Sequence, residues 1–376
     1  PLIVYIQGTL SGYTTQISVK RTANISILGL GTDAKFLGFG MKVVDCQNII
    51  VRNITFADCK VDEKDGLGID GSVNVWVDHC SFTDSPSSDP SGSNHDGQLD
   101  VKSGASNVTL SFNHFMNHRK TCLLGHTPGQ TSDSSMKVTY YANWFDGTYS
   151  RNPRIRFAKT HVLNNLYSNN GIIPDNGGYG IGVTCNAQVL AEGNYFENTL
   201  LPTLISTVND PGGTLSGDPA GFIKSLNNVT VNSGTIVENL GSYNFDPHSF
   251  YSYSAFDAQA VKNIVSENAG AGILNITTAV ETKAHEAPNS LQLLSNYPNP
   301  FNPSTIIRFS LPGSSTAVLK VYDMLGNEVA TLFNSEAKQG TVYSVTFDAS
   351  KLASGIYLSV LQSGGTVAVQ KMMLMK

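Results

Sequence analysis

The sequence predicts an all-β protein in which a parallel β-helix is followed by a small β-sandwich. Six nine-residue segments end in an aromatic residue, and apolar and polar residues tend to alternate within them, which is typical of short strands. Successive aromatic residues are 26, 33, 30, 22 and 29 residues apart, about one coil of a β-helix. Several further strand patterns follow residue 291. The six aromatic residues are Phe56, Phe82, Phe115, Phe145, Tyr167 and Phe196.

The repeats exclude some architectures and leave one alternative. Leucine-rich and helical repeats would show helical periodicity, which these copies lack. An antiparallel sandwich remains the alternative, because strand patterns alone do not fix the topology of a sheet. Trp76 and Asn113 recur within the repeats, so we assign them to the scaffold first.

The composition of the chain indicates which kinds of binding partner can be excluded. The chain has 376 residues and a formal net charge of −5, which allows one large domain or two unequal ones. An acidic balance argues against nucleic acid, because phosphate binding needs a basic face. No run of eighteen apolar residues occurs, so no membrane-spanning helix is expected. The first residues, PLIVYIQGTL, read as a strand within a fold and not as a signal peptide, so we expect the N-terminal part of the domain to be missing.

Acidic residues gather in two inserts, just before the second and third repeats. The first insert, VDEKDG, carries Asp62, Glu63 and Asp65; the second, HDGQLD, carries Asp96 and Asp100. Inserts of successive coils lie side by side, and carboxylates without accompanying cysteines favour calcium over transition metals. The spacing therefore indicates a calcium site, with solvated acidic loops as the alternative.

Basic residues follow in the next two inserts, within the motifs HRK and RNPRIR. They are His118, Arg119, Lys120, Arg151, Arg154 and Arg156. Neighbouring strands lie about 4.8 Å apart, so these cations are expected on rungs adjacent to the acidic groups. Fixed cations beside a metal favour a polyanion that carries carboxylates. A solvated basic turn is the alternative interpretation of RNPRIR.

The five cysteines are Cys46, Cys59, Cys80, Cys122 and Cys185. Small buried side chains explain them best, and none of their spacings resembles a zinc site. A disulfide between two of them stays open if the protein is exported.

The chain contains four longer motifs, DGLGIDGSVNVWVDHCSF, HDGQLDVKSGASNVTLSFNHF, HRKTCLLGH and RNPRIRF. Their order and approximate spacing resemble those of pectate lyases of polysaccharide lyase family 1. The similarity runs from residue 1 to about residue 274. The resemblance implies a right-handed parallel β-helix that cleaves polygalacturonate by calcium-assisted β-elimination, giving unsaturated oligogalacturonides.

The resemblance also implies roles for single residues. The family's calcium-binding aspartates match Asp65, Asp96 and Asp100, and a further acidic ligand of some members matches Glu63. Lys120 and Arg156 match residues that hold substrate carboxylates. Arg151 matches the arginine that takes the proton from C5 of the sugar.

Other residues near these motifs are assigned to support. Arg154 is left open between the substrate site and a structural ion pair. His118 and His126 flank the site and are expected to support it by hydrogen bonds. Asp78 and His79 suggest an acid–base pair, but they fall inside a repeat strand, so we assign them to the scaffold.

The implied chemistry explains these residue types. Elimination at a uronate requires removal of a proton alpha to a carboxylate, which is barely acidic while that carboxylate keeps its charge. Calcium and the cations neutralise the carboxylate and stabilise the charge that develops in the transition state. An arginine ordinarily keeps its proton, so an alkaline medium favours its use as the base.

The residue composition and the pattern of apolar residues change after about residue 282. We expect a β-helix domain over residues 1–282, a polar linker over 283–290 and a second domain over 291–376. Short strands and turns such as LGN and ASG suit a small β-sandwich.

The second domain contains the motifs YPNPFNPSTIIRF, VYDMLGNEV and ASGIYLSVL. These motifs resemble the C-terminal sorting domain of the type IX secretion system of Gram-negative bacteria. The resemblance implies export across the outer membrane to a secreted or cell-surface location, with the secretion machinery as a partner. A carbohydrate-binding or cell-wall module of similar fold is the alternative.

Three functions from different classes therefore remain. We expect a monomeric, calcium-dependent pectate lyase that binds Ca²⁺ and polygalacturonate. A calcium-independent pectin lyase is disfavoured because Asp65, Asp96 and Asp100 are all present, and the resemblance implies that this branch lacks them. A β-helix that only binds polysaccharide is disfavoured by the intact set Arg151, Lys120 and Arg156.

Overall fold

The computed structural model describes residues 1–84, 93–171, 177–274, 276, 290–324, 326–339 and 341–374. Two compact units make up the chain, Pro1–Thr278 and Ala279–Lys376. The predicted linker, residues 283–290, lies outside the described residues except for its last position. No helix in the described part of the chain is long and apolar enough to cross a membrane.

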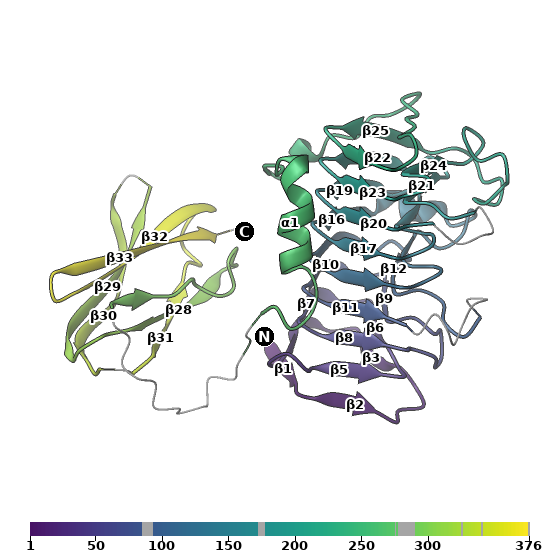
Figure 1. The fold of residues 1–376 in the computed structure, drawn as a ribbon. Coiled ribbons are helices and arrows are strands. Elements are labelled where there is room, and N and C mark those ends of the chain that lie inside the picture. Colours follow the sequence, from purple (N-terminus) through teal and green to yellow (C-terminus); the bar gives the residue numbers. More distant parts are fainter. Residues whose placement is uncertain are drawn as a thin grey trace. The chain divides into compact units, whose positions relative to one another are not determined.

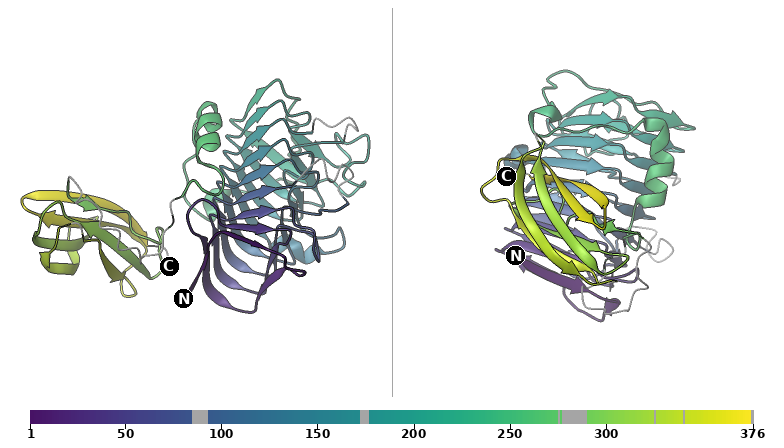
Figure 2. Two further views of the ribbon diagram at one scale, coloured as in Figure 1. Left: turned by 60° about the horizontal axis from the view of Figure 1, so that its bottom comes forward. Right: turned by 90° about the vertical axis from the view of Figure 1, so that its left-hand side faces the viewer.

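The first unit is a parallel β-helix in which each coil adds strands to three sheets (Figures 1 and 2). Within the described residues, sheets A, B and C contain nine, nine and eight strands. Strands of successive coils pair in parallel throughout, as β10 with β7 and β13. The predicted β-helix is therefore confirmed, and the antiparallel alternative is wrong for this unit.

The strands of the three sheets are as follows, in spatial order. Sheet A comprises β1 (Leu2–Ile6), β4 (Ala23–Gly29), β7 (Gln47–Arg52), β10 (Val73–Asp78), β13 (Ser106–Ser111), β16 (Lys137–Tyr141), β19 (Lys159–Leu163), β22 (Gln188–Glu192) and β25 (Phe222–Leu226). Sheet B comprises β2 (Thr9–Ser11), β5 (Lys35–Leu37), β8 (Thr55–Ala57), β11 (Ser81–Thr83), β14 (His114–Met116), β17 (Trp144–Asp146), β20 (Leu166–Ser168), β23 (Tyr195–Glu197) and β26 (Val229–Val231). Sheet C comprises β24 (Thr203–Ile205), β21 (Ile181–Thr184), β18 (Arg154–Arg156), β15 (Leu123–Leu124), β12 (Leu99–Lys102), β9 (Leu67–Asp70), β6 (Met41–Val44) and β3 (Ile17–Lys20).

The six aromatic residues of the repeat form one stack inside the β-helix. Each lies on sheet B in register with the next, as Phe82 with Phe56 and Phe115. Consecutive rings are stacked with centroids 4.4–5.1 Å apart. Burying a side chain of this kind contributes about 1.5–3 kcal/mol, so the stack is a principal source of stability.

A row of asparagines runs beside this stack, at the turn between sheets A and B. The side-chain amide of Asn113 donates to Asn143 at 2.9 Å, and that of Asn143 donates to Asn165 at 3.0 Å. Asn194 and Asn228 continue the row. Because buried backbone groups at a turn need partners, these amides are structural, as predicted for Asn113.

Among the described residues of the first unit, one α-helix and two short 3₁₀ helices accompany the strands. The α-helix, α1 (Ala258–Asn268), contacts β20 and β23 and lies along the side of the β-helix (Figure 1). Its buried Val261 and Val265 pack with Leu166 and Tyr195. The 3₁₀ helices span Thr131–Ser135 and Pro247–Ser249.

The second unit contains two antiparallel sheets with a common apolar core, which confirms the predicted β-sandwich. The core takes Phe309 and Phe347 from one sheet and Leu319 and Leu361 from the other. One sheet comprises β27 (Gln292–Leu293), β28 (Ser304–Ser310) and β31 (Tyr343–Asp348). The other comprises β30 (Glu328–Ala337), β29 (Ser315–Asp323), β32 (Gly355–Ser363) and β33 (Thr366–Leu374).

All five cysteines are buried and free, so the structure contains none of the disulfides that the sequence left open. Burial raises the pKa of the Cys80 thiol to about 12. These thiols act as small apolar side chains, as the sequence predicted.

Candidate active site

Three of the four predicted calcium ligands surround one lysine at sheet C. The Nζ atom of Lys102 lies 3.4 Å from Oδ2 of Asp65 and 3.6 Å from Oδ2 of Asp100. Oε2 of Glu63 lies 3.7 Å from the same Nζ atom. Asp65 and Asp100 are buried because β9 and β12 pair, which brings the two inserts together. Glu63 is exposed and also forms an ion pair with Lys42.

Burial makes the negative charges of Asp65 and Asp100 unfavourable. Burial, followed by the charge of Asp100, raises the pKa of Asp65 to about 8. Burial also raises the pKa of Asp100. Two carboxylates that resist ionisation in this way need a cation beside them. Lys102 supplies one such cation, and burial alone would lower its pKa, but Asp100 and Asp65 raise it.

Sequence reasoning missed Lys102. The signal was present, because Lys102 follows Asp100 by two residues on strand β12, and residues two apart on a strand face the same side. Lys42 was also missed, and it carries no comparable signal because it lies far away in sequence, on β6.

Asp96, the fourth predicted ligand, lies with the basic groups. Its Oδ1 atom is 3.1 Å from Nζ of Lys120, and its side chain is half-exposed. The backbone N–H of Asp96 donates to the carbonyl of Lys64 at 3.0 Å, which joins the two acidic inserts. Asp62 is turned elsewhere and accepts from the backbone of Gln16 at 2.6 Å.

The donor set fits a hard divalent cation such as calcium. Carboxylate oxygens of Asp65, Asp100 and Glu63 converge on the ammonium of Lys102, and burial raises the pKa values of Asp65 and Asp100. Carboxylate oxygens are among the ligands that calcium prefers.

A pocket with a volume of about 290 Å³ lies beside this acidic cluster. Its lining includes the cations Arg119, Lys120, Arg151 and Arg154, and no acidic residue among those described. The guanidinium of Arg119 lies 4.8 Å from the ring centre of Tyr149, a cation–π contact. The pocket therefore suits a ligand that carries negative charge.

Arg151 enters this pocket from the turn before β18. Its φ angle is +60°, in the left-handed region, and its carbonyl accepts from the N–H of Cys122 at 2.7 Å. Such a backbone conformation persists only where the surrounding structure holds it. Among the residues that the structure describes, none forms an ion pair with the Arg151 guanidinium.

Arg154 and Arg156 share a single carboxylate, that of Asp218. Their guanidinium nitrogens lie 3.1 and 3.2 Å from its Oδ2 atom. Arg156 also donates to the carbonyls of Gly125 and His126, at 3.3 and 3.2 Å. Burial, and then the neighbouring charge of Arg154, lower the pKa of Arg156.

Both arginines form an ion pair with Asp218, and Arg154 also lines the pocket, so the contacts agree with either of the two roles that the sequence left open for it. Arg156 lies next to the pocket, but it is 7% exposed and does not line it. Asp218 was missed, because it lies in a long insert without a pattern to mark it.

Asp78 and His79 lie on or after β10 of sheet A, away from the acidic cluster on sheet C. Asp78 pairs with Arg52 at 2.6 Å and with His79 at 2.7 Å, and it accepts from Ser111. This network supports their assignment to the scaffold.

Comparison with known proteins places both units in families. Residues 7–274 match the family model described as pectate lyase, and residues 295–375 match that described as secretion system C-terminal sorting domain. A pectate trisaccharide-lyase of Bacillus licheniformis is 33% identical over 279 residues, which cover 73% of this chain and 76% of that protein. A pectate lyase of Bacillus subtilis is 30% identical over 289 residues, covering 69% and 67%.

A solved structure is similar over the same unit. A pectate lyase from Bacillus sp. N165, in complex with trigalacturonate, has a TM-score of 0.63 and 29% sequence identity. The match covers 73% of this chain and 86% of that one. With its matching family model, its relatives and its β-helix, the chain belongs to the pectate lyase family and is a polysaccharide lyase.

Proposed function

We propose that this chain is a calcium-dependent pectate lyase that cleaves α-1,4-linked polygalacturonate and releases 4,5-unsaturated oligogalacturonides. One observation carries the proposal: a buried carboxylate cluster lies beside a pocket lined by four cations. A polymer with a carboxylate on each sugar can bind to the pocket cations directly. It can bind to the carboxylate cluster through a metal ion held between them.

Asp65, Asp96, Asp100 and Glu63 hold the calcium ion. When bound, calcium supplies positive charge that neutralises a substrate carboxylate. Lys102 holds the two buried carboxyls in place and partly offsets the effect of burial on their pKa values, because its ammonium lies 3.4 Å from Asp65 and 3.6 Å from Asp100.

Lys120 and Arg156 bind the substrate carboxylates, and Arg151 acts as the base. Lys120 pairs with Asp96 in the free protein, so its ammonium is already held at the edge of the pocket. Arg151 takes the proton from C5, the electron pair forms the C4–C5 double bond, and the C4–O bond breaks. The departing oxygen then takes a proton from solvent. Fixed cations around the sugar carboxylate lower the barrier because they need no reorganisation.

The second unit directs export. Residues 291–376 are recognised by the type IX secretion machinery, which carries the protein across the outer membrane of a Gram-negative bacterium to the surface or medium. The match of residues 295–375 to a sorting-domain model supports this assignment. The lyase unit is taken to work as a monomer.

The test is an assay of elimination on polygalacturonate, followed by the ultraviolet absorbance of the unsaturated product. We expect product with calcium and none after chelation, with activity restored by added calcium. A highly methyl-esterified pectin is the matched substrate. Activity on this pectin with chelator present would identify a pectin lyase, and binding without product would identify a non-catalytic polysaccharide-binding protein.

A further inference from the structure

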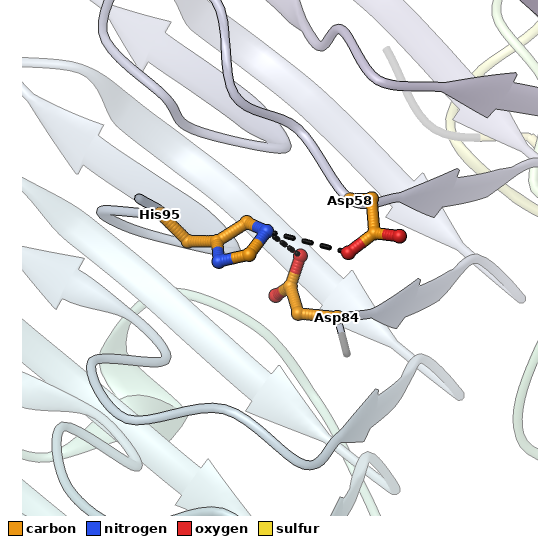
Figure 3. Close-up of side chains that lie close together, drawn as sticks. All are labelled: Asp58, Asp84 and His95. Atoms are coloured by element: carbon orange, nitrogen blue, oxygen red, sulfur yellow. Dashed lines mark ion pairs between the residues drawn. The ribbon is translucent and has the colours of Figure 1, made fainter. Parts of the chain in front are cut away.

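A second group of charged side chains lies behind the acidic cluster, at the end of the strands of sheet B. Asp58 follows β8 directly and Asp84 follows β11 directly, so the two aspartates occupy the same place on successive coils. His95 reaches them from the insert that carries Asp96, and one edge of its ring faces both carboxylates (Figure 3). Nε2 of His95 is 3.4 Å from an oxygen of each.

Asp84 also contacts the segments on both sides of the proposed site. Its Oδ2 atom lies 2.6 Å from Nδ1 of His118 and accepts from Nε2 of Gln98 at 3.1 Å. The same Nε2 of Gln98 donates to the carbonyl of Met116 at 3.0 Å. One partly buried carboxylate therefore holds the acidic insert, through Gln98, and the basic segment, through His118.

His118 completes the link. Its Nε2 atom is 2.7 Å from the main-chain carbonyl of Asp96, and the His118 side chain is buried. His118 precedes Lys120 by two residues, and Lys120 forms an ion pair with the side chain of Asp96 at 3.1 Å. The Asp96 carbonyl and the Lys120 segment are thus joined to Asp84 by one imidazole ring.

From this geometry we propose that Asp84 and His118 are positioning residues, which fix the backbone of Asp96 relative to Lys120. The inference rests on the proposed function, because it takes Asp96 as a calcium ligand and Lys120 as a substrate ligand. Neither positioning residue touches the pocket or the carboxylates around Lys102. Groups of this kind orient a ligand and commonly change metal affinity by about 10- to 100-fold when removed.

The experiment compares Asp84→Asn and His118→Leu with the wild-type full-length chain. Asp84→Asn keeps the shape of the side chain but removes its charge, and His118→Leu removes both hydrogen bonds at similar volume. We expect calcium affinity, measured by calorimetry without substrate, to fall by about 10- to 100-fold in both. KM for polygalacturonate should rise at limiting calcium, while kcat at saturating calcium and substrate should recover.

Asp146→Asn is the matched control. Asp146 ends β17 of the same sheet and contacts His114 at 3.2 Å, which reproduces an aspartate–histidine contact between coils with no link to Asp96 or Lys120. Its calcium affinity and KM should equal those of the wild type. Thermal unfolding of every variant separates a loss of fold from a loss of positioning.

Each outcome decides the proposal. Folded Asp84→Asn and His118→Leu proteins with wild-type calcium affinity and KM would overturn it, and so would an equal loss in Asp146→Asn. If Asp84→Asn does not fold, His118→Leu decides alone. If neither folds, both residues are structural and the positioning role is rejected. A wild-type protein that forms unsaturated product without binding calcium would overturn the positioning role while leaving the lyase function standing.

Discussion

At the scale of single residues, the site contains charged side chains that lie close together and are only partly paired with groups of opposite charge. Asp65 and Asp100 are buried with raised pKa values, and Lys102 is the cation that they share. On the neighbouring rung Arg151 has no ion-pair partner among the described residues, although three other cations line the same pocket. Both halves of the site are therefore most stable with a ligand of opposite charge.

The first residue-scale prediction concerns Arg151 as the base. Arg151→Lys keeps the positive charge but loses the planar group, so kcat should fall by at least about 10²-fold while KM changes little. Arg156→Lys should mainly raise KM, because its proposed role is to hold a carboxylate. Steady-state kinetics over a range of pH provide the measurement, and wild-type activity should climb above neutral pH. Retention of most turnover with the wild-type pH profile in Arg151→Lys would reassign the base.

The second residue-scale prediction concerns the pH dependence of calcium binding. A carboxyl must lose its proton to bind a metal, and the pKa of Asp65 is about 8 in the free protein. Apparent calcium affinity should therefore rise as pH rises from 6 toward 8 and level off above that range, as measured by calorimetry at several pH values. In Asp65→Asn the affinity should be lower and this slope should be reduced. An affinity that does not change between pH 6 and pH 9 would contradict the raised pKa.

At the scale of elements, the coil is the repeating unit, and its two buried rows hold successive coils in register. The aromatic stack contributes burial, and the asparagine row satisfies backbone groups at a turn that water cannot reach. An exposed row of asparagines also exists, in which Asn74 donates to Asn48 and accepts from Asn107. The two rows differ in burial, so their contributions to the free energy of unfolding should differ as well.

The element-scale prediction compares these two rows. Asn143→Ala leaves the N–H and amide of Asn113, the carbonyl of Leu110 and the amide oxygen of Asn165 without this partner. Each buried unsatisfied group costs about 1–3 kcal/mol, so the loss in the free energy of unfolding should exceed about 3 kcal/mol. Denaturant titration gives the value. Asn74→Gly, which tolerates the φ angle of +57° there, should cost less than about 1 kcal/mol, and equal losses in the two variants would contradict the role of burial.

Elements and site differ in how far the sequence predicts them. The aromatic spacing and the asparagines before it are local patterns, so they mark the coils and place Asp65 and Asp100 on neighbouring rungs. The position of Lys102 among the carboxylates and the sharing of Asp218 by Arg154 and Arg156 depend on side-chain packing between distant segments. A single sequence does not record such contacts, so the burial of Arg156 and its ion pair with Asp218 could not be predicted from it.

At the scale of the whole molecule, the chain is built from two units with separate cores. The β-helix core and the sandwich core share no residue, and every proposed catalytic residue belongs to the first unit. Independent cores of this kind normally fold independently.

The whole-molecule prediction follows from that division. Truncation after residue 282 should yield soluble protein with unchanged kcat and KM on polygalacturonate, but it should abolish export from the native host. Activity of the purified proteins and the distribution of product between cells and medium provide the measurements. A large loss of turnover in a folded truncated protein would indicate that the second unit binds substrate.

The five free cysteines make it possible to measure how readily individual coils of the β-helix open. They are spread from Cys46 to Cys185, all buried, and a buried thiol reacts with an alkylating reagent only when its coil opens. In a repeat architecture each coil is held mainly by its neighbours, so coils can open separately, and the coil of Cys46, which is 3% exposed, should open more readily than those whose thiols are fully buried. Mass spectrometry of alkylated peptides should therefore find Cys46 modified before Cys80 and Cys122, which are fully buried. If all five thiols were modified at one rate, the β-helix would open as a single cooperative unit.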